Sequence, residues 1–468
     1  MIQIQACNVG PIVGHTEPHQ VRLWGRATYQ TLNRGKLKRA FGIVQLQKTG
    51  QPYLPPRLFK MNPNFDMTGI ICWDKLEPNS HYTYQMGWFF DEREMPALQT
   101  NDAWDWDNAD QGHFYTANPD ATAARTFLFG SCRYLLKIFG GTWFDDRGDK
   151  TFKTMNQHLD QDHDIHQLLM VGDQIYADDL NFISPDQQVD EYLLRYQDAF
   201  RQPHIKALMA RVSTYMTLDD HEIEDNWPNH ASQKDMMRKY PAAMHAYQVY
   251  QASHSPLLTV DKHCKLKGNN DKFYYTFSDG CCDFFVTDSR TERNLQQQTM
   301  LSEVQIHALL DWLQDDSGKA KLVVTSVPFF PDTKKSGCDK WGAFTKQRDI
   351  IIQCIQENHI QKVVFLSGDV HCSMAAALDV SLPDEPALHI YSVISSAFYW
   401  PYPHMKRSQF NLTGHVASAN NPKAYKLGQV SKVCSDDNFS KVHVTNSGIS
   451  IEVYTRKGDL AHRIHYNF

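Results

Sequence analysis

Residues 168–179, LLMVGDQIYADD, join four apolar residues to a glycine and then to a tail rich in oxygen-bearing side chains. A short, continuous apolar run is typical of a strand that is buried on both faces, as in the sheet of an α/β domain. Gly172 permits a tight turn directly after the strand. Because ligands of open α/β sheets bind outside the carboxyl ends of the strands, Asp173 and Tyr176 are expected to face a functional site.

Similar apolar runs recur along the rest of the chain. Helix-like segments separate them, including residues 240–254 and 303–316. This alternation predicts an α/β domain that starts near Thr126. The runs that we expect to form its sheet are TFLF (126–129), LLMV (168–171), YMTL (215–218), FFVT (284–287), KLVVTS (321–326), KVVFLS (362–367) and LHIYSV (388–393). The chain is expected to close on a hairpin that turns at Lys457-Gly458-Asp459.

The N-terminal part has a different pattern. Up to about residue 115, short alternating segments are separated by Pro, Gly and Asn, which predicts an all-β module. Residues 76–82, LEPNSHY, resemble the tyrosine corner of fibronectin type III domains. At 468 residues the chain exceeds the usual size of one hydrophobic core. We therefore expect a β-sandwich over residues 1–118 and an α/β domain over residues 119–468.

The overall composition is that of a globular protein, with 42% hydrophobic and 21% charged residues. The net charge of -6 arises from mixed signs, which argues against a broad nucleic-acid surface or an anionic membrane surface as partner. The N-terminus lacks a basic segment followed by an apolar one, and no window reaches the ~18 apolar residues of a membrane span. These features predict a cytoplasmic location and a small-molecule substrate, and they leave the oligomeric state open.

Four of the predicted strands end in side chains that can bind metal. Asp after a strand is more often a helix cap or a turn residue, but four such strand ends are hard to explain in that way. If they converge, their carboxylates, imidazole, thiol and phenol would repel one another unless cations were bound. The sequence therefore predicts a metal site, with two ions, built from Cys132, Asp173, Tyr176, Asp219, Asp220, His221, Asp369 and His371.

The motifs GSCR, GDQIY, DDHE and GDVH, in this order, resemble those of the calcineurin-like metallophosphoesterases, and specifically of their PhoD-like (alkaline phosphatase D) branch. DNW (225–227), TDSR (287–290), DKW (339–341) and SSAF (395–398) are also similar to that branch. The resemblance implies a four-layer αββα metallophosphatase domain, preceded here by the fibronectin III-like sandwich.

The resemblance also implies a ligand set. Asp173 would bridge two metal ions, which in this family are Fe³⁺ with Ca²⁺; Mn²⁺, Mg²⁺ or Zn²⁺ are alternatives. Cys132, Tyr176 and His371 would complete the first site. Asp220 and Asp369 would hold the second, with Asp219 as the alternative to Asp220.

The implied reaction is hydrolysis of a phosphodiester or phosphomonoester, with a metal-bound hydroxide as nucleophile. His221 would protonate the leaving group, oriented by Glu222 or Asp225. Three further residues would contact substrate oxygens, each with a structural role as its alternative: Arg133, Asn226 and Arg290. Residues 137–146 and 181–188 are expected to form rim loops that set substrate choice.

Two other functions are compatible with these residues. The chain could be a non-catalytic metallophosphatase-like module whose sandwich binds a partner. It could also be a dinuclear hydrolase of another ester class, such as a carboxylic ester, a lactone or a sulfate. PhoD-like proteins are commonly exported with a twin-arginine signal, and the N-terminus of this sequence has none.

Overall fold

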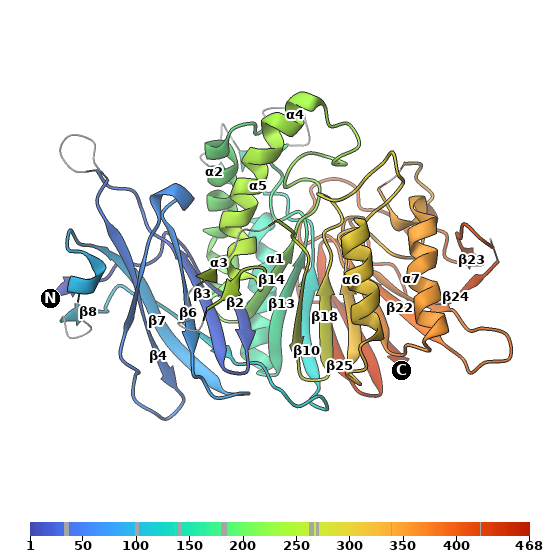
Figure 1. Cartoon of the computed structure of the whole chain (residues 1–468), viewed down its shortest axis with the longest axis horizontal. Coiled ribbons are helices and arrows are strands. Elements are labelled where there is room, and N and C mark those ends of the chain that lie inside the picture. The colour runs from blue at the N-terminus through green and yellow to red at the C-terminus, as the bar shows by residue number, and fades with distance from the viewer. Residues whose placement is uncertain are drawn as a thin grey trace.

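This computed structural model describes residues 1–31, 37–98, 103–135, 137–138, 143–178, 185–261, 266–267, 271–337, 339–421 and 423–468. Two antiparallel sheets form its N-terminal part (Figure 1). Their strand orders are β2-β3-β6 and β5-β4-β7-β9. The strands are β2 (Val9–Glu17), β3 (Gln20–Arg26), β4 (Ala40–Lys48), β5 (Arg57–Lys60), β6 (Thr68–Asp74), β7 (His81–Phe90) and β9 (Asp110–Tyr115). The hydroxyl of Tyr82 accepts a hydrogen bond from the Glu77 N–H at 3.0 Å, as the tyrosine corner predicts.

Two larger sheets follow. The first has the order β14-β13-β10-β25-β26-β27 and the second the order β17-β18-β19-β20-β22-β21-β24-β23. The first contains β10 (Arg125–Gly130), β13 (Ile165–Val171), β14 (Ser213–Thr217), β25 (Asn438–Thr445), β26 (Gly448–Thr455) and β27 (Leu460–Asn467). The second contains β17 (Tyr275–Asp279), β18 (Cys282–Val286), β19 (Ala320–Val324), β20 (Val363–Ser367), β21 (Met374–Asp379), β22 (His389–Ile394), β23 (His415–Val416) and β24 (Tyr425–Val430).

All seven apolar runs that were predicted to be strands lie on strands. They do not form one sheet, however, because three belong to the first sheet and four to the second. An apolar run reports that both faces of a strand are buried and does not identify the neighbouring strand. The C-terminal hairpin turns at 457–459, as predicted, and β25 adds a third strand to it.

Helices cover the outer faces of the two sheets (Figure 1). They are α1 (Arg147–Gln161), α2 (Val189–Phe200), α3 (Pro203–Met209), α4 (Gln233–Met237), α5 (Lys239–Tyr250), α6 (Glu303–Gln314) and α7 (Thr345–Glu357). The remaining short strands are β1 (Ile2–Gln3), β8 (Trp104–Asp105), β11 (Lys137–Ile138), β12 (Trp143–Phe144), β15 (Thr259–Val260) and β16 (Leu266–Lys267).

Alternate residues of the central strands enter different cores, as the two-residue period of a strand requires. Leu128 on β10 packs with α1, α2, α3 and α5 in one core. Phe127 and Phe129 on the same strand pack between the two sheets, against Phe284 of β18. A third core joins the opposite face of the second sheet to α6 and α7. The layers therefore run helix, sheet, sheet, helix.

The N-terminal sheets pack against this layered region. The indole of Trp24 donates a hydrogen bond to the Val249 carbonyl of α5 at 3.1 Å. Thr16 and Ser213 share a 2.8 Å hydrogen bond between β2 and β14. Within the described part of the chain, no helix combines the length and apolar character needed to cross a membrane.

Candidate metal centre

The candidate site lies where four strands end. β10, β13 and β14 run parallel, so their carboxyl ends meet at one edge of the first sheet. β20 of the second sheet brings the loop of Gly368–His371 to the same place. Four side chains in these loops lie on residues with positive φ, between 48° and 68°: Cys132, Asp173, Asp369 and His371. Non-glycine residues in this region are strained, and such strain clusters at functional sites.

Two glycines allow the loops to approach closely. A Cβ on Gly172 would lie 2.3 Å from the Cβ of Asp219, and Gly172 also has a φ of +89°. A Cβ on Gly368 would lie 2.2 Å from the Oγ of Ser131. Any larger residue at either position would push the strand ends apart.

The first group of candidate ligands gathers around one oxygen of Asp173. Its Oδ2 lies 3.3 Å from the Sγ of Cys132 and 3.2 Å from the hydroxyl of Tyr176. That hydroxyl lies 3.4 Å from Nε2 of His371. Four side chains from three strand ends thus share one small volume.

The second group consists of carboxylates. Oxygens of Asp173, Asp219, Asp220 and Asp369 all lie within 4.8 Å of one another. Asp173 belongs to both groups, which is the position of a bridging ligand. Asp220 and Asp369 line the adjoining cavity, whereas Asp219 is paired with the buried guanidinium of Arg290.

The electrostatics of this cluster indicate that a counter-charge is needed. Burial, reinforced by neighbouring acidic groups, raises the pKa of Asp173 and Asp369 well above the usual range of a carboxyl. Burial and the charge of Asp369 raise the pKa of the Cys132 thiol to about 12. One buried oxygen of Asp219 has no hydrogen-bond partner among the described residues. Bound cations would relieve both conditions, and the donor set of sulfur, phenol, imidazole and carboxylates fits metal ions.

Glu222 connects the loop after β13 with the loop after β14. Its carboxylate is fully buried and accepts backbone N–H bonds from Asp173 at 3.1 Å, Gln174 at 2.6 Å and Asp219 at 2.9 Å. These bonds join the loop after β13 to the loop after β14. The role of this residue is therefore to position the backbone of two strand ends.

His221 faces the cavity from the side opposite to the lysines described below. Its Nδ1 lies 2.9 Å from a carboxylate oxygen of the fully buried Asp178. Burial opposes protonation of His221, but Asp220, Asp178 and Asp173 outweigh burial and raise its pKa well above 6.5. The expectation that Glu222 orients His221 is wrong, because Glu222 binds backbone amides. Asp225, the alternative to Glu222, lies 3.8 Å from Nε2, but the carboxylate of Asp178 lies closer to the ring. Asp178 belongs to the sequence YADD (176–179), but nothing in that sequence indicates that its carboxylate contacts the ring of His221.

Arg133 does not reach the cavity. Its guanidinium is fully buried and donates to the Gly148 carbonyl at 2.7 Å, the Ala199 carbonyl at 2.5 Å and Asp149 at 3.3 Å. These contacts contradict the prediction that Arg133 binds substrate, and they support its structural alternative. Cys132 has a positive φ in the turn after β10, and the path of the backbone there directs Cys132 to the site and Arg133 into the core.

The other two predicted substrate contacts differ from each other. Arg290 is fully buried beneath the cavity, where it pairs with Asp219, with Asp339 at 2.7 Å and with Asp220 at 3.5 Å. It thereby connects the TDSR and DKW motifs, and its contacts are those of its structural alternative. Asn226 does line the cavity, and its backbone N–H donates to Asp220 at 2.5 Å.

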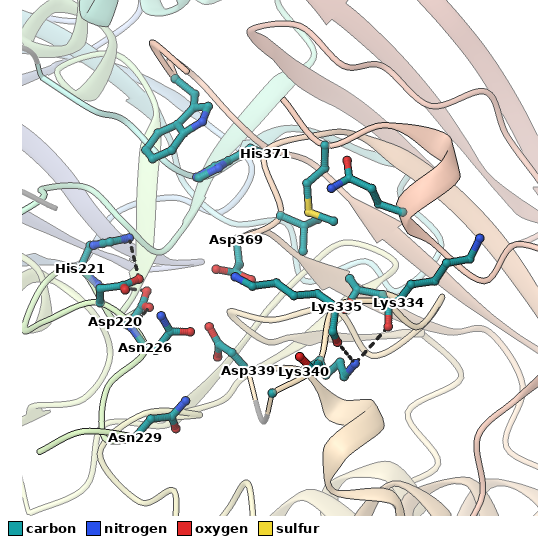
Figure 2. Close-up of a pocket in the computed structure, with 18 of the residues that line it drawn as sticks. Asp220, His221, Asn226, Asn229, Lys334, Lys335, Asp339, Lys340, Asp369 and His371 are labelled. Atoms are coloured by element: carbon teal, nitrogen blue, oxygen red, sulfur yellow. Dashed lines mark hydrogen bonds and ion pairs between the residues drawn. The ribbon is translucent and has the colours of Figure 1, made fainter. Parts of the chain in front are cut away.

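A cavity of about 1000 Å³ opens beside the candidate ligands. Figure 2 shows Asp220, His221, Asp369 and His371 on one side of it and the loop of Lys334, Lys335 and Lys340 on the other. Trp400 also lines it and stacks on the His371 ring with centroids 3.8 Å apart. Neither the lysines nor Trp400 was singled out from the sequence. Residues 139–142 and 181–184 of the two predicted rim loops lie outside the described residues.

Comparison with known proteins supports the resemblance that the motifs indicated. The family of PhoD-like phosphatases matches residues 136–427. This chain belongs to that family. The matched region begins after Cys132 and contains the other predicted metal ligands.

Individual relatives agree with this family. Alkaline phosphatase D of Bacillus subtilis (strain 168) is 26% identical over 221 residues, which span 41% of this chain and 36% of that protein. A solved structure of PhoD superposes with a TM-score of 0.71 at 16% identity, over 97% of this chain and 92% of that one. Purple acid phosphatase PPD1 from yellow lupin (Lupinus luteus) superposes with a TM-score of 0.60 at 13% identity, over 98% and 74%. This chain shares the mixed α/β fold of these two solved structures.

Proposed function

We propose that this PhoD-like protein hydrolyses phosphoesters, diesters or monoesters, at a centre of two metal ions. The observation that carries the proposal is the convergence of two ligand groups on Asp173, within a chain that belongs to this family. The first ion would be held by Cys132, Asp173, Tyr176 and His371, and the second by Asp173, Asp220 and Asp369. Asp220 is preferred to Asp219 because it lines the cavity and because Arg290 binds Asp219 more closely than Asp220, from which it lies 3.5 Å away.

The donor set supports a mixed pair of ions. A thiol, a phenol and an imidazole suit Fe³⁺ or another transition metal, whereas carboxylates suit Ca²⁺, Mg²⁺ or Mn²⁺. When bound, two cations would stabilise the phosphoryl oxygens and activate water as the nucleophile. Fe³⁺ with Ca²⁺ is the pair that we propose.

The residues of the chain supply the proton. Asp178 holds Nδ1 of His221, which leaves Nε2 to face the cavity. Asp178, which is not a proposed metal ligand, favours the protonated imidazole, so His221 can donate to the departing alkoxide. General acid catalysis of this kind typically contributes ~10²–10⁴-fold.

Turnover of a chromogenic phosphodiester and its matching monoester tests the proposal. The protein is supplied with iron and Ca²⁺, or with Mn²⁺, and Asp173→Ala is the control. Activity in the wild type and its loss in the control, with the fold verified by circular dichroism, are the expected results. Inactivity of folded, metal-loaded wild type on both substrates would refute it, and assays of carboxylic, lactone and sulfate esters would then test the other hydrolase class.

The N-terminal region enters the proposal as a separate unit. We infer a fibronectin III-like sandwich over residues 1–118 and a catalytic domain over residues 119–468. The two antiparallel sheets and the hydrogen bond of Tyr82 support this division. Expression of residues 119–468 alone tests it: a fragment that folds by circular dichroism would support the division, and one that does not fold would contradict it.

A further inference from the structure

Three lysines line the cavity within the described residues, and their ammonium groups are used differently. Lys334 donates to the Ser408 carbonyl at 2.9 Å. Lys340 donates to the Thr333 carbonyl at 3.0 Å and to the carbonyl of Lys335. The Lys335 ammonium makes no hydrogen bond or ion pair with any residue that the structure describes. It is therefore the cation available to a ligand.

The direction of the Lys335 side chain points to the same use. Figure 2 shows Lys335 extending from its loop toward Asp369, while Lys334 extends the other way. The other cations beneath the site are engaged, because Arg290 and Arg293 share Asp339.

The backbone that carries Lys335 is held in place. Thr333 forms a β-bridge with Phe410, and the Lys334 N–H donates to the Gln409 carbonyl at 2.8 Å. Lys340 closes the loop from the other side through its bonds to the carbonyls of Thr333 and Lys335. The backbone of Lys335 is therefore fixed beside the cluster, so only its side chain loses conformational freedom when the ammonium binds a ligand.

We propose that Lys335 selects substrates whose phosphoryl group carries two negative charges. This inference rests on the proposed phosphoesterase function and narrows it to phosphomonoesters as the favoured class. A phosphomonoester is mostly dianionic above its second pKa near 6, whereas a diester carries one charge. Two bound cations would stabilise the oxygens of both substrates alike. Lys335 adds a charge-assisted contact. This contact is strongest with the second anionic oxygen, which a monoester has and a diester lacks.

The test compares p-nitrophenyl phosphate with methyl p-nitrophenyl phosphate, which share a leaving group. Metal-loaded wild type is compared with Lys335→Met and with Lys335→Arg. The methionine variant is expected to lose about 10-fold in kcat/KM for the monoester and less than about 3-fold for the diester. The arginine variant keeps the charge and is expected to retain most of the preference. Lys334→Met is the matched control, since it removes one charge from the same loop and should lower kcat/KM for both substrates by the same factor.

A binding measurement provides the second readout. Calorimetric titration of the metal-loaded protein with inorganic phosphate at pH 8 should give a Kd about 10-fold higher for Lys335→Met than for Lys334→Met. A monoester-to-diester ratio that falls less than about 3-fold in Lys335→Met, or equal phosphate affinities of the two variants, would overturn the inference. Wild type that hydrolyses neither ester would refute the proposed function instead, and the phosphate titration would still test Lys335.

Discussion

Replacement of Asp178 by asparagine tests how the proton donor is positioned. Asp178 has no exposed side chain, and both of its oxygens lie within 3.0 Å of Nδ1 of His221. Asparagine has the same shape but no charge, and its single acceptor oxygen must serve both His221 and the N–H of Asp225, which Asp178 now binds at 2.8 Å. A buried hydrogen bond to a charged partner is worth about 1.5–3 kcal/mol, so Asp178→Asn should lower kcat/KM by roughly 10- to 150-fold.

The assay uses kcat/KM for p-nitrophenyl phosphate and phenyl phosphate. Phenolate is the poorer leaving group and needs the proton more, so Asp178→Asn should reduce turnover of phenyl phosphate more strongly. In a His221→Asn background, Asp178→Asn should have little further effect, because the two residues act as a unit. Equal losses for both substrates, or additive losses in the double variant at unchanged metal content, would refute the assigned role.

Three other perturbations have expected outcomes. Tyr82→Phe removes the buried hydrogen bond to the Glu77 N–H and should cost about 1 kcal/mol in urea unfolding with kcat/KM unchanged; a loss of activity at full stability would contradict this. Arg290→Met leaves the buried Asp219 without its ion-pair partner and removes one of the two arginines that bind Asp339, so it should destabilise the protein by about 3–5 kcal/mol, whereas Arg290→Lys should cost less; equal stability of Arg290→Met and wild type, by thermal unfolding, would show that the pairs do not matter. Removal of bound metal by a chelator should lower the melting temperature, since ligand at 1,000 times its Kd stabilises by about 4 kcal/mol; a melting temperature independent of added metal would argue against the site.

Much of the fold could be predicted because burial leaves a direct trace in the sequence. The apolar runs located the central strands, and the residues after four of them located the site. The arrangement into two sheets could not be predicted, because the partner of a strand such as β18 depends on contacts far along the chain. The apolar runs of the central strands are similar in the two sheets, because these strands are buried on both faces.

The site was predictable only where position along a strand determines direction. Cys132 and Asp173 follow strands directly, so their placement at the sheet edge was expected. Arg133 was misplaced because it lies in the turn after β10, where the path of the backbone and not adjacency to Cys132 sets the direction of its side chain. Asp178 and Lys335 lie in loops, where the path of the backbone sets the contact and no spacing rule applies.

Metal content per chain is the measurement that tests the central claim most directly. Wild type, loaded with iron and Ca²⁺ and freed of excess ions, should contain two metal ions per chain by plasma mass spectrometry. Asp173→Asn should lose both, because Asp173 belongs to both ligand groups, whereas Asp369→Asn should keep the ion of Cys132, Tyr176 and His371. A wild type that binds one ion or none, or an Asp173→Asn variant that keeps two, would contradict a dinuclear centre bridged by Asp173.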